Sequence, residues 1–225
     1  MTLAIFDLDN TLIAGDSDHL WGEFLCTQGM VDEERFRAEN EEFYADYQRG
    51  ELDIRAYLSF ALAPLAGRAP QSLRELQHKF VRDYITPIML PAAGELIEKH
   101  RDQGDRLLII TATNEFVTQP IAALLCIQTL LGCSVETKYG ILTGLPTGTL
   151  TYREGKVQRL REWLASEKET LAGAWFYSDS HNDLPLLEIV DNPVLVDPDP
   201  TLAQRGSERG WPQISLRQPT ASQEY

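Results

Sequence analysis

Apolar runs that end in small polar residues recur along this chain. The first is Leu3 to Phe6, which leads directly into Asp7. Strands that are buried on both faces of a sheet have this continuous apolar character. Four such runs predict strands: LAIF at 3–6, RLLIITATN at 106–114, AWFYSD at 174–179 and PVLVD at 193–197.

Helical patterns separate these runs. Within residues 90–103, one helix face consists of Leu90, Ala93, Ile97 and His100, and Gly104 follows as a residue that ends helices. Strands joined by helical crossovers form parallel sheets that are covered on both faces. The pattern therefore predicts an α/β fold, with a Rossmann-like, doubly wound parallel sheet and helices on both sides.

Residues 15–84 have a different pattern, without a strand-like run. Phe36, Phe43 and Tyr47 are spaced by seven and four positions, so they share one helix face, with acidic residues between them. Two further segments also look helical, YLSFALAPLAG at 57–67 and SLRELQHKFVRDY at 72–84. We therefore expect a core of residues 1–14 and 85–225, with a small helical domain of residues 15–84 inserted after the first strand.

Two stretches near the middle of the chain are less regular. Residues 121–135 are the most apolar stretch, and we read them as a buried helix that runs into a strand. Residues 139–155, YGILTGLPTGTLTYREG, contain four glycines and alternating Leu and Thr, which predicts a β-hairpin or flap beside the core. The tail after Leu216 is polar, and we expect it to be frayed.

Charge and composition narrow the range of partners and compartments. The 225 residues include 34 acidic and 20 basic side chains, a formal net charge of −14, which disfavours nucleic acids and anionic membranes as partners. No basic segment precedes an apolar one at the N-terminus, so we expect no signal peptide, and residues 121–135 are too short to span a bilayer.

The three cysteines, Cys26, Cys126 and Cys133, lack metal-type spacing and predict reduced, mostly buried thiols in a cytoplasmic protein. No pattern indicates an oligomeric state.

Candidate chemistry lies where the predicted strands end, because ligands bind at the carboxyl edge of open α/β sheets. Asp7 and Asp9 follow the first strand, Thr111 ends the second, and SDSHND at 178–183 ends the third. Four carboxylates would then share one cleft, those of Asp7, Asp9, Asp179 and Asp183. Their mutual repulsion requires a positive charge, and oxygen ligands favour Mg²⁺. Lys156, at a predicted helix start, would add another positive charge.

Each of these residues also has an ordinary structural interpretation. Asp and Asn after a strand commonly serve as turn or helix-cap residues, and Asn114 fits a cap of the following helix. Thr111 alone fits a strand-end hydroxyl, and Lys156 alone fits a solvated helix residue. His181 fits a loop residue, and His19 fits either a packed histidine or one that faces a substrate.

Taken together, four motifs resemble those of the haloacid dehalogenase superfamily, and specifically its phosphatases. They are DLDNT at 7–11, ITATN with Thr111, GK with Lys156, and SDSHND at 178–183, in the order that the family has them. The helical insert after the first motif matches the cap of the phosphoserine-phosphatase-like subfamily IB. Asp9 argues for ester cleavage, because relatives that break carbon–halogen or phosphonate bonds keep no acid there.

The resemblance implies a role for each motif residue. Asp7 would be the nucleophile that forms an aspartyl-phosphate, and Asp9 the general acid and base. Magnesium would be held by the carboxylates of Asp7 and Asp179 and the backbone carbonyl of Asp9, while Asp183 orients the metal's waters. Three residues would bind the phosphate oxygens: Thr111, Lys156 and Asn182. The same aspartates would also serve a phosphomutase, and a non-catalytic module that binds phosphorylated metabolites is a third alternative.

The resemblance also bears on the substrate, a small phosphorylated metabolite. Phosphoserine phosphatases need an acid for the substrate's ammonium group, for which Asp16 is the candidate, and an arginine for its carboxylate. The matching segment, residues 57–67, contains no basic residue, and Arg55 would have to face the site to replace one. A carboxylate buried without a cation is strongly disfavoured. The sequence also resembles the branch that includes histidinol-phosphate phosphatases, so the expected substrate is an amino-alcohol phosphate such as histidinol phosphate; the alternatives are phosphoserine and a broad range of phosphomonoesters.

Overall fold

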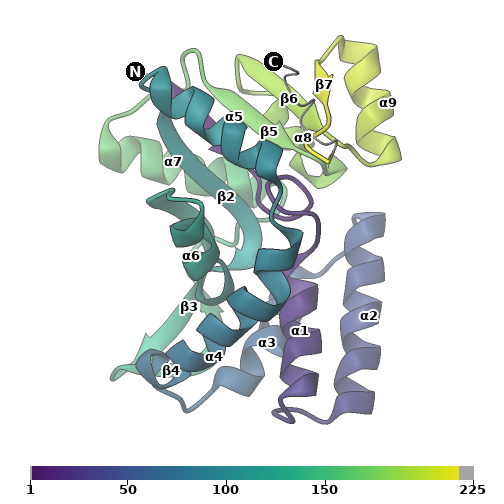
Figure 1. The fold of residues 1–225 in the computed structure, drawn as a ribbon, viewed down its shortest axis with the longest axis vertical. Helices are drawn as coiled ribbons and strands as arrows, with labels where there is room; N and C mark the ends of the chain where they lie inside the picture. The colour runs from purple at the N-terminus through teal and green to yellow at the C-terminus, as the bar shows by residue number, and fades with distance from the viewer. Residues whose placement is uncertain (1, 218–225) are drawn as a thin grey trace, which may run out of the picture.

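The computed structural model describes residues 2–217, which form a mixed sheet with helices on both faces (Figure 1). The strand order is β4-β3-β2-β1-β5-β6-β7, and every neighbouring pair is parallel except β3 with β4. The strands are β1 (Leu3–Phe6), β2 (Arg106–Asn114), β3 (Thr129–Lys138), β4 (Ile141–Thr147), β5 (Trp175–Ser178), β6 (Asn192–Val196) and β7 (Gln213–Ile214). The four strands expected from the apolar runs are confirmed as β1, β2, β5 and β6.

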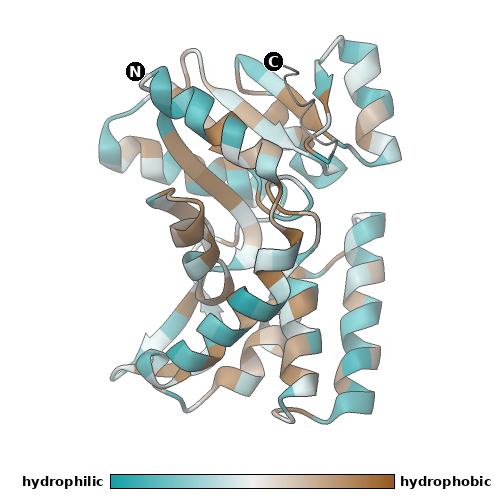
Figure 2. Cartoon of the chain, in the orientation of Figure 1, coloured by the Kyte–Doolittle hydropathy of each residue, from teal (hydrophilic) through white to brown (hydrophobic). Residues whose placement is uncertain are grey.

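Helices cover the sheet on both sides, as a doubly wound fold requires. They are α5 (Pro91–Asp102), α6 (Glu115–Leu124), α7 (Glu154–Glu167), the short α8 (Leu184–Leu187) and α9 (Pro200–Arg209). Phe6 packs in one apolar cluster with residues of α5 and α6, whereas its neighbour Ile5 packs in another with residues of α7, α8 and α9. Alternation along a strand sends these two side chains to opposite faces, which explains why β1 and residues 107–110 of β2 are continuously apolar (Figure 2).

The segment expected to be a helical insert is helical and contains no strand. It holds α1 (Ser17–Thr27), α2 (Glu33–Arg49), α3 (Ile54–Leu62) and α4 (Arg74–Phe80), and single helical turns follow from Val81 to Ile88. Trp21, Phe24 and Phe80 are buried and in contact, with the Trp21 ring centroid 5.1 Å from that of Phe80. These helices lie together in the lower half of Figure 1, beside the β3–β4 hairpin and below β5 and β6.

The β-hairpin predicted for residues 139–155 forms, but it extends beyond this range. This stretch supplies one strand, β4, whose partner is the preceding strand β3, and the two meet at a turn in which Tyr139 and Gly140 have positive φ. β3 continues past Val135, so the helix-then-strand interpretation of 121–135 is correct but its strand is longer. The hairpin also joins the helical segment, because Leu142 exchanges backbone hydrogen bonds with Gly67 and Arg68, both of 2.9 Å.

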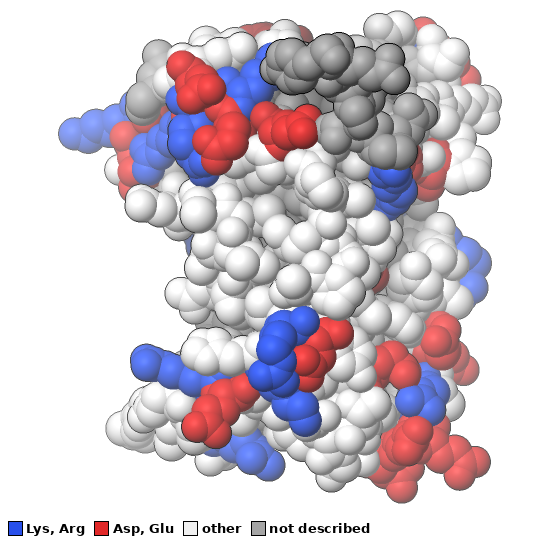
Figure 3. Space-filling view, in the orientation of Figure 1, with Lys and Arg blue, Asp and Glu red and all other residues white. Residues whose placement is uncertain are grey.

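Three remaining expectations concern thiols, membranes and the tail. All three cysteines are free thiols; Cys26 and Cys133 are buried and Cys126 is exposed. Among residues 2–217, every helix falls short of the length and apolarity that crossing a membrane would need. Positive and negative side chains are interleaved on the face shown in Figure 3, which carries no continuous basic patch. The expected frayed tail lies, from residue 218 onward, outside the described residues.

Candidate active site

Asp7 and Asp9 lie immediately beyond β1, at the carboxyl edge of the sheet. The backbone N–H of Asp7 donates to the carbonyl of Tyr177 at 2.9 Å, so the β1–β5 ladder extends to this residue and fixes it. The Asp9 carboxylate accepts hydrogen bonds from the Ser17 N–H at 2.6 Å, the Thr113 hydroxyl at 2.8 Å and the Thr111 hydroxyl at 3.3 Å. The two carboxylates therefore have separate sets of partners although one residue separates them.

Lys156 joins Asp7 to Asp183. Its Nζ atom lies 2.8 Å from Oδ1 of Asp7 and 2.7 Å from Oδ1 of Asp183, and all three side chains are buried. Ser178 donates to Asp183 at 2.7 Å and fixes its orientation. The helix that carries Lys156 starts close to the preceding loop, because a Cβ on Gly155 would lie 1.9 Å from the carbonyl oxygen of Leu150. The GK pair thus combines a close backbone approach with a buried cation.

Asp179 and Asn182 occupy the loop after β5. The Asp179 carboxylate accepts from the Thr11 hydroxyl at 2.9 Å, which links it to the loop after β1. The Asn182 amide donates to the backbone carbonyl of Tyr47 at 3.2 Å and accepts from the Tyr152 hydroxyl at 3.1 Å. Asn182 therefore connects the catalytic edge to α2 of the helical segment.

Burial of these carboxylates makes their charged forms unfavourable. Burial raises the pKa of Asp7 to about 7 against the opposing effect of Lys156, and Asp183 and Asp9 raise it further. The pKa of Asp9 rises to about 6, first through burial and then through Asp16. Burial and the neighbouring Asp7 raise the pKa of Asp179 well above its ordinary value. For Lys156, the carboxylates of Asp183 and Asp7 raise the pKa overall, although burial alone would lower it.

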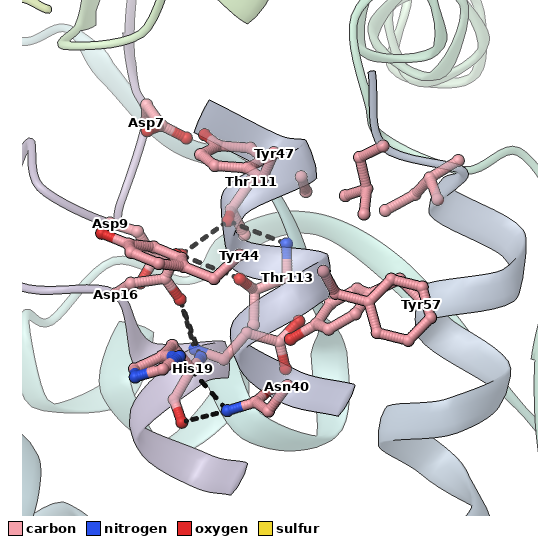
Figure 4. Close-up of a pocket in the computed structure, with 15 residues that line it drawn as sticks. Asp7, Asp9, Asp16, His19, Asn40, Tyr44, Tyr47, Tyr57, Thr111 and Thr113 are labelled. Carbon is pink, nitrogen blue, oxygen red and sulfur yellow. Dashed lines mark hydrogen bonds between the residues drawn. The ribbon is translucent and has the colours of Figure 1, made fainter. Parts of the chain in front are cut away.

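A pocket of about 510 Å³, including its opening to solvent, lies between the sheet edge and helices α1, α2 and α3 (Figure 4). Asp7, Asp9, Asp16 and Thr111 line it, as the sequence predicts for a shared site. The pocket lining does not include Lys156, Asp179, Asn182 or Asp183, although Lys156 contacts Asp7, which does line it. The residues that the sequence analysis did not assign to the site are Asp18, His19, Asn40, Phe43, Tyr44, Tyr47, Leu52, Ile54, Tyr57, Ala112 and Thr113.

Asp16 has a structural role in addition to its place in the pocket. It caps the N-terminus of α1, where its carboxylate accepts from the backbone N–H groups of Asp18 at 3.0 Å and His19 at 2.9 Å. His19 is held in turn by Asn40, whose amide lies 3.2 Å from the ring Nδ1, and its ring contacts that of Tyr44. Asn114 caps α6, as its position after a strand predicts.

The donor set fits a hard cation. The oxygens near the sheet edge come from the carboxylates of Asp7, Asp179 and Asp183, and the single charge of Lys156, which contacts Asp7 and Asp183, does not balance them. Among the described residues, no three side chains of His, Cys, Asp or Glu surround a common point. The expected ligand set does not require three, because it consists of two carboxylates, those of Asp7 and Asp179, and the backbone carbonyl of Asp9.

Comparisons with known proteins agree with this geometry. Residues 4–188 match the family model of haloacid dehalogenase-like hydrolases. A histidinol-phosphatase of Neisseria meningitidis is 46% identical over 219 residues, which cover 96% of this chain and 99% of the relative. A phosphoserine phosphatase of Mycobacterium tuberculosis is 31% identical over 211 residues, 92% of this chain and 68% of the relative.

Solved structures share the fold. The crystal structure of a Bordetella pertussis protein of unknown function has a TM-score of 0.89 at 40% identity and covers 96% of this chain and 100% of its own. A substrate-bound phosphoserine phosphatase has a TM-score of 0.69 at 15% identity and covers 96% of this chain and 93% of its own, which shows a common fold.

Proposed function

This chain belongs to the haloacid dehalogenase-like hydrolase family and is a phosphatase, and on that premise we propose that it hydrolyses a small phosphomonoester through a phosphorylated Asp7. The observation that carries the proposal is the pairing of a buried Asp7, held 2.8 Å from Lys156, with a separately hydrogen-bonded Asp9. The first arrangement favours an ionised, oriented nucleophile, and the second favours a carboxyl group that can hold a proton.

The reaction would proceed in two half-reactions. An oxygen of Asp7 attacks phosphorus, the bond to the alcohol oxygen breaks, and Asp9 donates its proton to the departing alkoxide. Asp9 then accepts a proton from water, which attacks the aspartyl-phosphate, releases inorganic phosphate and restores the Asp7 carboxylate. A pKa of about 6 suits Asp9 to both steps, because it can carry a proton and return to the ionised form near neutral pH.

Magnesium is the proposed cofactor, held by the carboxylates of Asp7 and Asp179 and the backbone carbonyl of Asp9. When bound, it would neutralise charge on the phosphoryl oxygens and on Asp7. Asp183, which we expect near the metal's waters, accepts hydrogen bonds from Lys156 and Ser178. We therefore propose that Asp183 also holds Lys156 in position. Thr111, Lys156 and Asn182 are the proposed ligands of the phosphate.

The helical segment 15–84 is the proposed specificity cap over a core of residues 1–14 and 85–225. The pocket supports this division, since the sheet edge contributes its catalytic carboxylates and α1, α2 and α3 contribute the rest of its wall. Arg55 is exposed and lies outside the lining, which contains no lysine or arginine among the described residues. A substrate carboxylate would therefore meet only carboxylates, aromatic rings and neutral groups.

A cationic substrate fits this wall better. Asp16 would face the ammonium group, and the rings of Tyr44, Tyr47 and Tyr57 offer π-faces for a positive charge. Because the Neisseria relative is a histidinol-phosphatase, we take an amino-alcohol phosphate such as histidinol phosphate as the preferred substrate.

Steady-state kinetics on histidinol phosphate and phosphoserine, with Mg²⁺ and with EDTA, test the proposal. We expect a higher kcat/KM for histidinol phosphate, no turnover in EDTA, and a higher KM for histidinol phosphate in Asp16→Ala. A clear preference for phosphoserine would overturn the substrate assignment, and similar rates on many phosphomonoesters would indicate a broad-specificity enzyme. Absence of metal-dependent phosphate release from every compound would overturn the proposed reaction, and an isomerised phosphosugar in an NMR panel would indicate a mutase.

A further inference from the structure

Asp18 is a buried carboxylate in the pocket wall that no motif accounts for. It lies in the first turn of α1, is 6% exposed, and lines the same pocket as Asp7 and Asp9. No lysine or arginine of the described chain lines this pocket with it. A buried carboxylate without a cation is unfavourable, so its presence here needs an explanation beyond the stability of the fold.

Asn114 fixes the orientation of Asp18, and Tyr57 lies beside it. Asn114 caps α6 by accepting the N–H of Val117 at 3.1 Å through its oxygen, which aims the amide nitrogen at Oδ1 of Asp18, also at 3.1 Å. The Tyr57 hydroxyl, from α3, lies beside the same carboxylate. The carboxylate thus has one residue of the core and one of the helical segment beside it, and neither neutralises it.

Asp16, the other carboxylate near the start of α1, has different hydrogen-bond partners from Asp18. Its carboxylate accepts two backbone N–H groups of α1 as a helix cap, an interaction that itself stabilises a helix. Asp18 makes no such cap, so the cap does not explain its retention in the wall. The rings of Phe43, Tyr57, His19 and Tyr44 line the same pocket, and they support one another in pairs, with centroids 5.3 Å apart for Phe43 and Tyr57 and 4.9 Å apart for His19 and Tyr44. They offer aromatic surface to a flat ligand group.

We infer that Asp18, positioned by Asn114 beside Tyr57, is a specificity-determining residue that binds a second basic nitrogen of the substrate, distinct from the ammonium group at Asp16. This rests on the proposed function and narrows it: the preferred substrates are phosphomonoesters that carry two basic nitrogens, one of them on a flat ring. An amino-alcohol phosphate with a hydrocarbon ring in place of the basic ring would leave Asp18 buried and unpaired, and would bind less well.

The test compares histidinol phosphate with phenylalaninol phosphate, which shares the amino alcohol and a flat ring but lacks a basic ring nitrogen. For the wild type we expect the ratio of kcat/KM values to favour histidinol phosphate by about tenfold or more, the size expected when a buried polar group loses its partner. Asp18→Asn should bring this ratio close to one, through a higher KM for histidinol phosphate, and Tyr57→Phe should lower it in part.

The control is Glu23→Gln. It removes one charge from the same helix, at a carboxylate that pairs with Arg37 outside the pocket, and it should leave the ratio unchanged.

The outcomes separate this inference from the proposed function. If Asp18→Asn folds, as judged by its melting temperature, and keeps the wild-type ratio, the inference is wrong while the phosphatase assignment stands. If it does not fold, the ratio in Tyr57→Phe decides, and an unchanged ratio overturns the inference. If the wild type releases no phosphate from an aryl phosphate with Mg²⁺, the proposed function itself fails.

Discussion

The Nζ atom of Lys156 lies 2.8 Å from Oδ1 of Asp7, and both residues are almost completely removed from solvent. Asp183 shares the same ammonium group, so one buried cation serves two buried carboxylates. Asp179 adds a further carboxylate, which accepts a hydrogen bond from the neutral Thr11 hydroxyl. The edge of the sheet therefore carries more negative than positive charge, and this imbalance underlies the predictions on metal binding and pH.

Magnesium should stabilise the folded protein. A cation that binds the native carboxylates and not the unfolded chain raises the free energy of unfolding by ~3 kcal/mol at about 100 times its Kd. We expect the melting temperature to rise across millimolar Mg²⁺, and Asp179→Asn to weaken both this rise and the activity. A melting temperature that does not respond to Mg²⁺ would count against the metal site.

Substitution of the two aspartates after β1 should lower the activity to different extents. Asp7→Asn should abolish turnover and leave the fold intact, because the amide has nearly the same shape but is a poor nucleophile. Asp9→Asn should slow the reaction by ~10²- to 10⁴-fold, because the proton donor and base is lost. Beryllofluoride, which mimics an aspartyl-phosphate, should inhibit the wild type only when Mg²⁺ is present. Substantial activity in Asp7→Asn would mean that another group is the nucleophile.

The glycine before Lys156 should tolerate no side chain. A Cβ at Gly155 would overlap the carbonyl oxygen of Leu150 at 1.9 Å, so the start of α7 would have to move and take Lys156 with it. We expect Gly155→Ala to reduce the free energy of unfolding by ~1–3 kcal/mol and to lower kcat. Gly94→Ala is the matched control: Gly94 lies within α5 in open space, where alanine should stabilise the helix by ~0.5–1 kcal/mol. Equal effects in chemical denaturation would refute the steric explanation.

The sequence predicts the sheet edge well because its chemistry is local to strand ends. Asp7 and Asp9 follow an apolar strand within three residues, so their place at its carboxyl end needs no tertiary information. Thr111 and the 178–183 loop follow by the same reasoning. Lys156 and Asp183 were expected near the phosphate and the metal's waters, but their direct contact depends on where α7 begins, which Gly155 decides sterically.

The pocket wall was predicted poorly because it depends on how helices face one another. Asp18 and Tyr57 are 39 positions apart on α1 and α3, and a helical pattern alone does not show which faces meet. One signal was available for Asp18: a charged residue that shares a helix face with the apolar Trp21 and Leu25. The hairpin was misplaced for a related reason, since the partner of β4 is a strand whose polar end, up to Lys138, looks like a loop.

The metal-free protein should lose stability as the pH rises toward neutrality. In the folded state the pKa of Asp7 is raised to about 7 and that of Asp9 to about 6, mainly by burial, whereas 3.8 is the ordinary value of an aspartate. Between about pH 4 and 7 the folded protein therefore holds protons that the unfolded chain has released, so the free energy of unfolding falls with rising pH. For each carboxyl group that is protonated in the folded protein and ionised in the unfolded chain, the free energy of unfolding falls by ~1.4 kcal/mol per pH unit.

Thermal or urea unfolding in EDTA, followed from pH 5 to 7.5, measures this slope. Asp7→Asn removes one of the two groups, so its slope should be shallower than that of the wild type, while other carboxylates titrate equally in both. Mg²⁺ should restore stability most at the high end of the range, because the cation favours the ionised carboxylates. If the two proteins lose stability in parallel across this range, Asp7 does not carry a raised pKa in the folded state, and the charge imbalance around Lys156 is smaller than the geometry indicates.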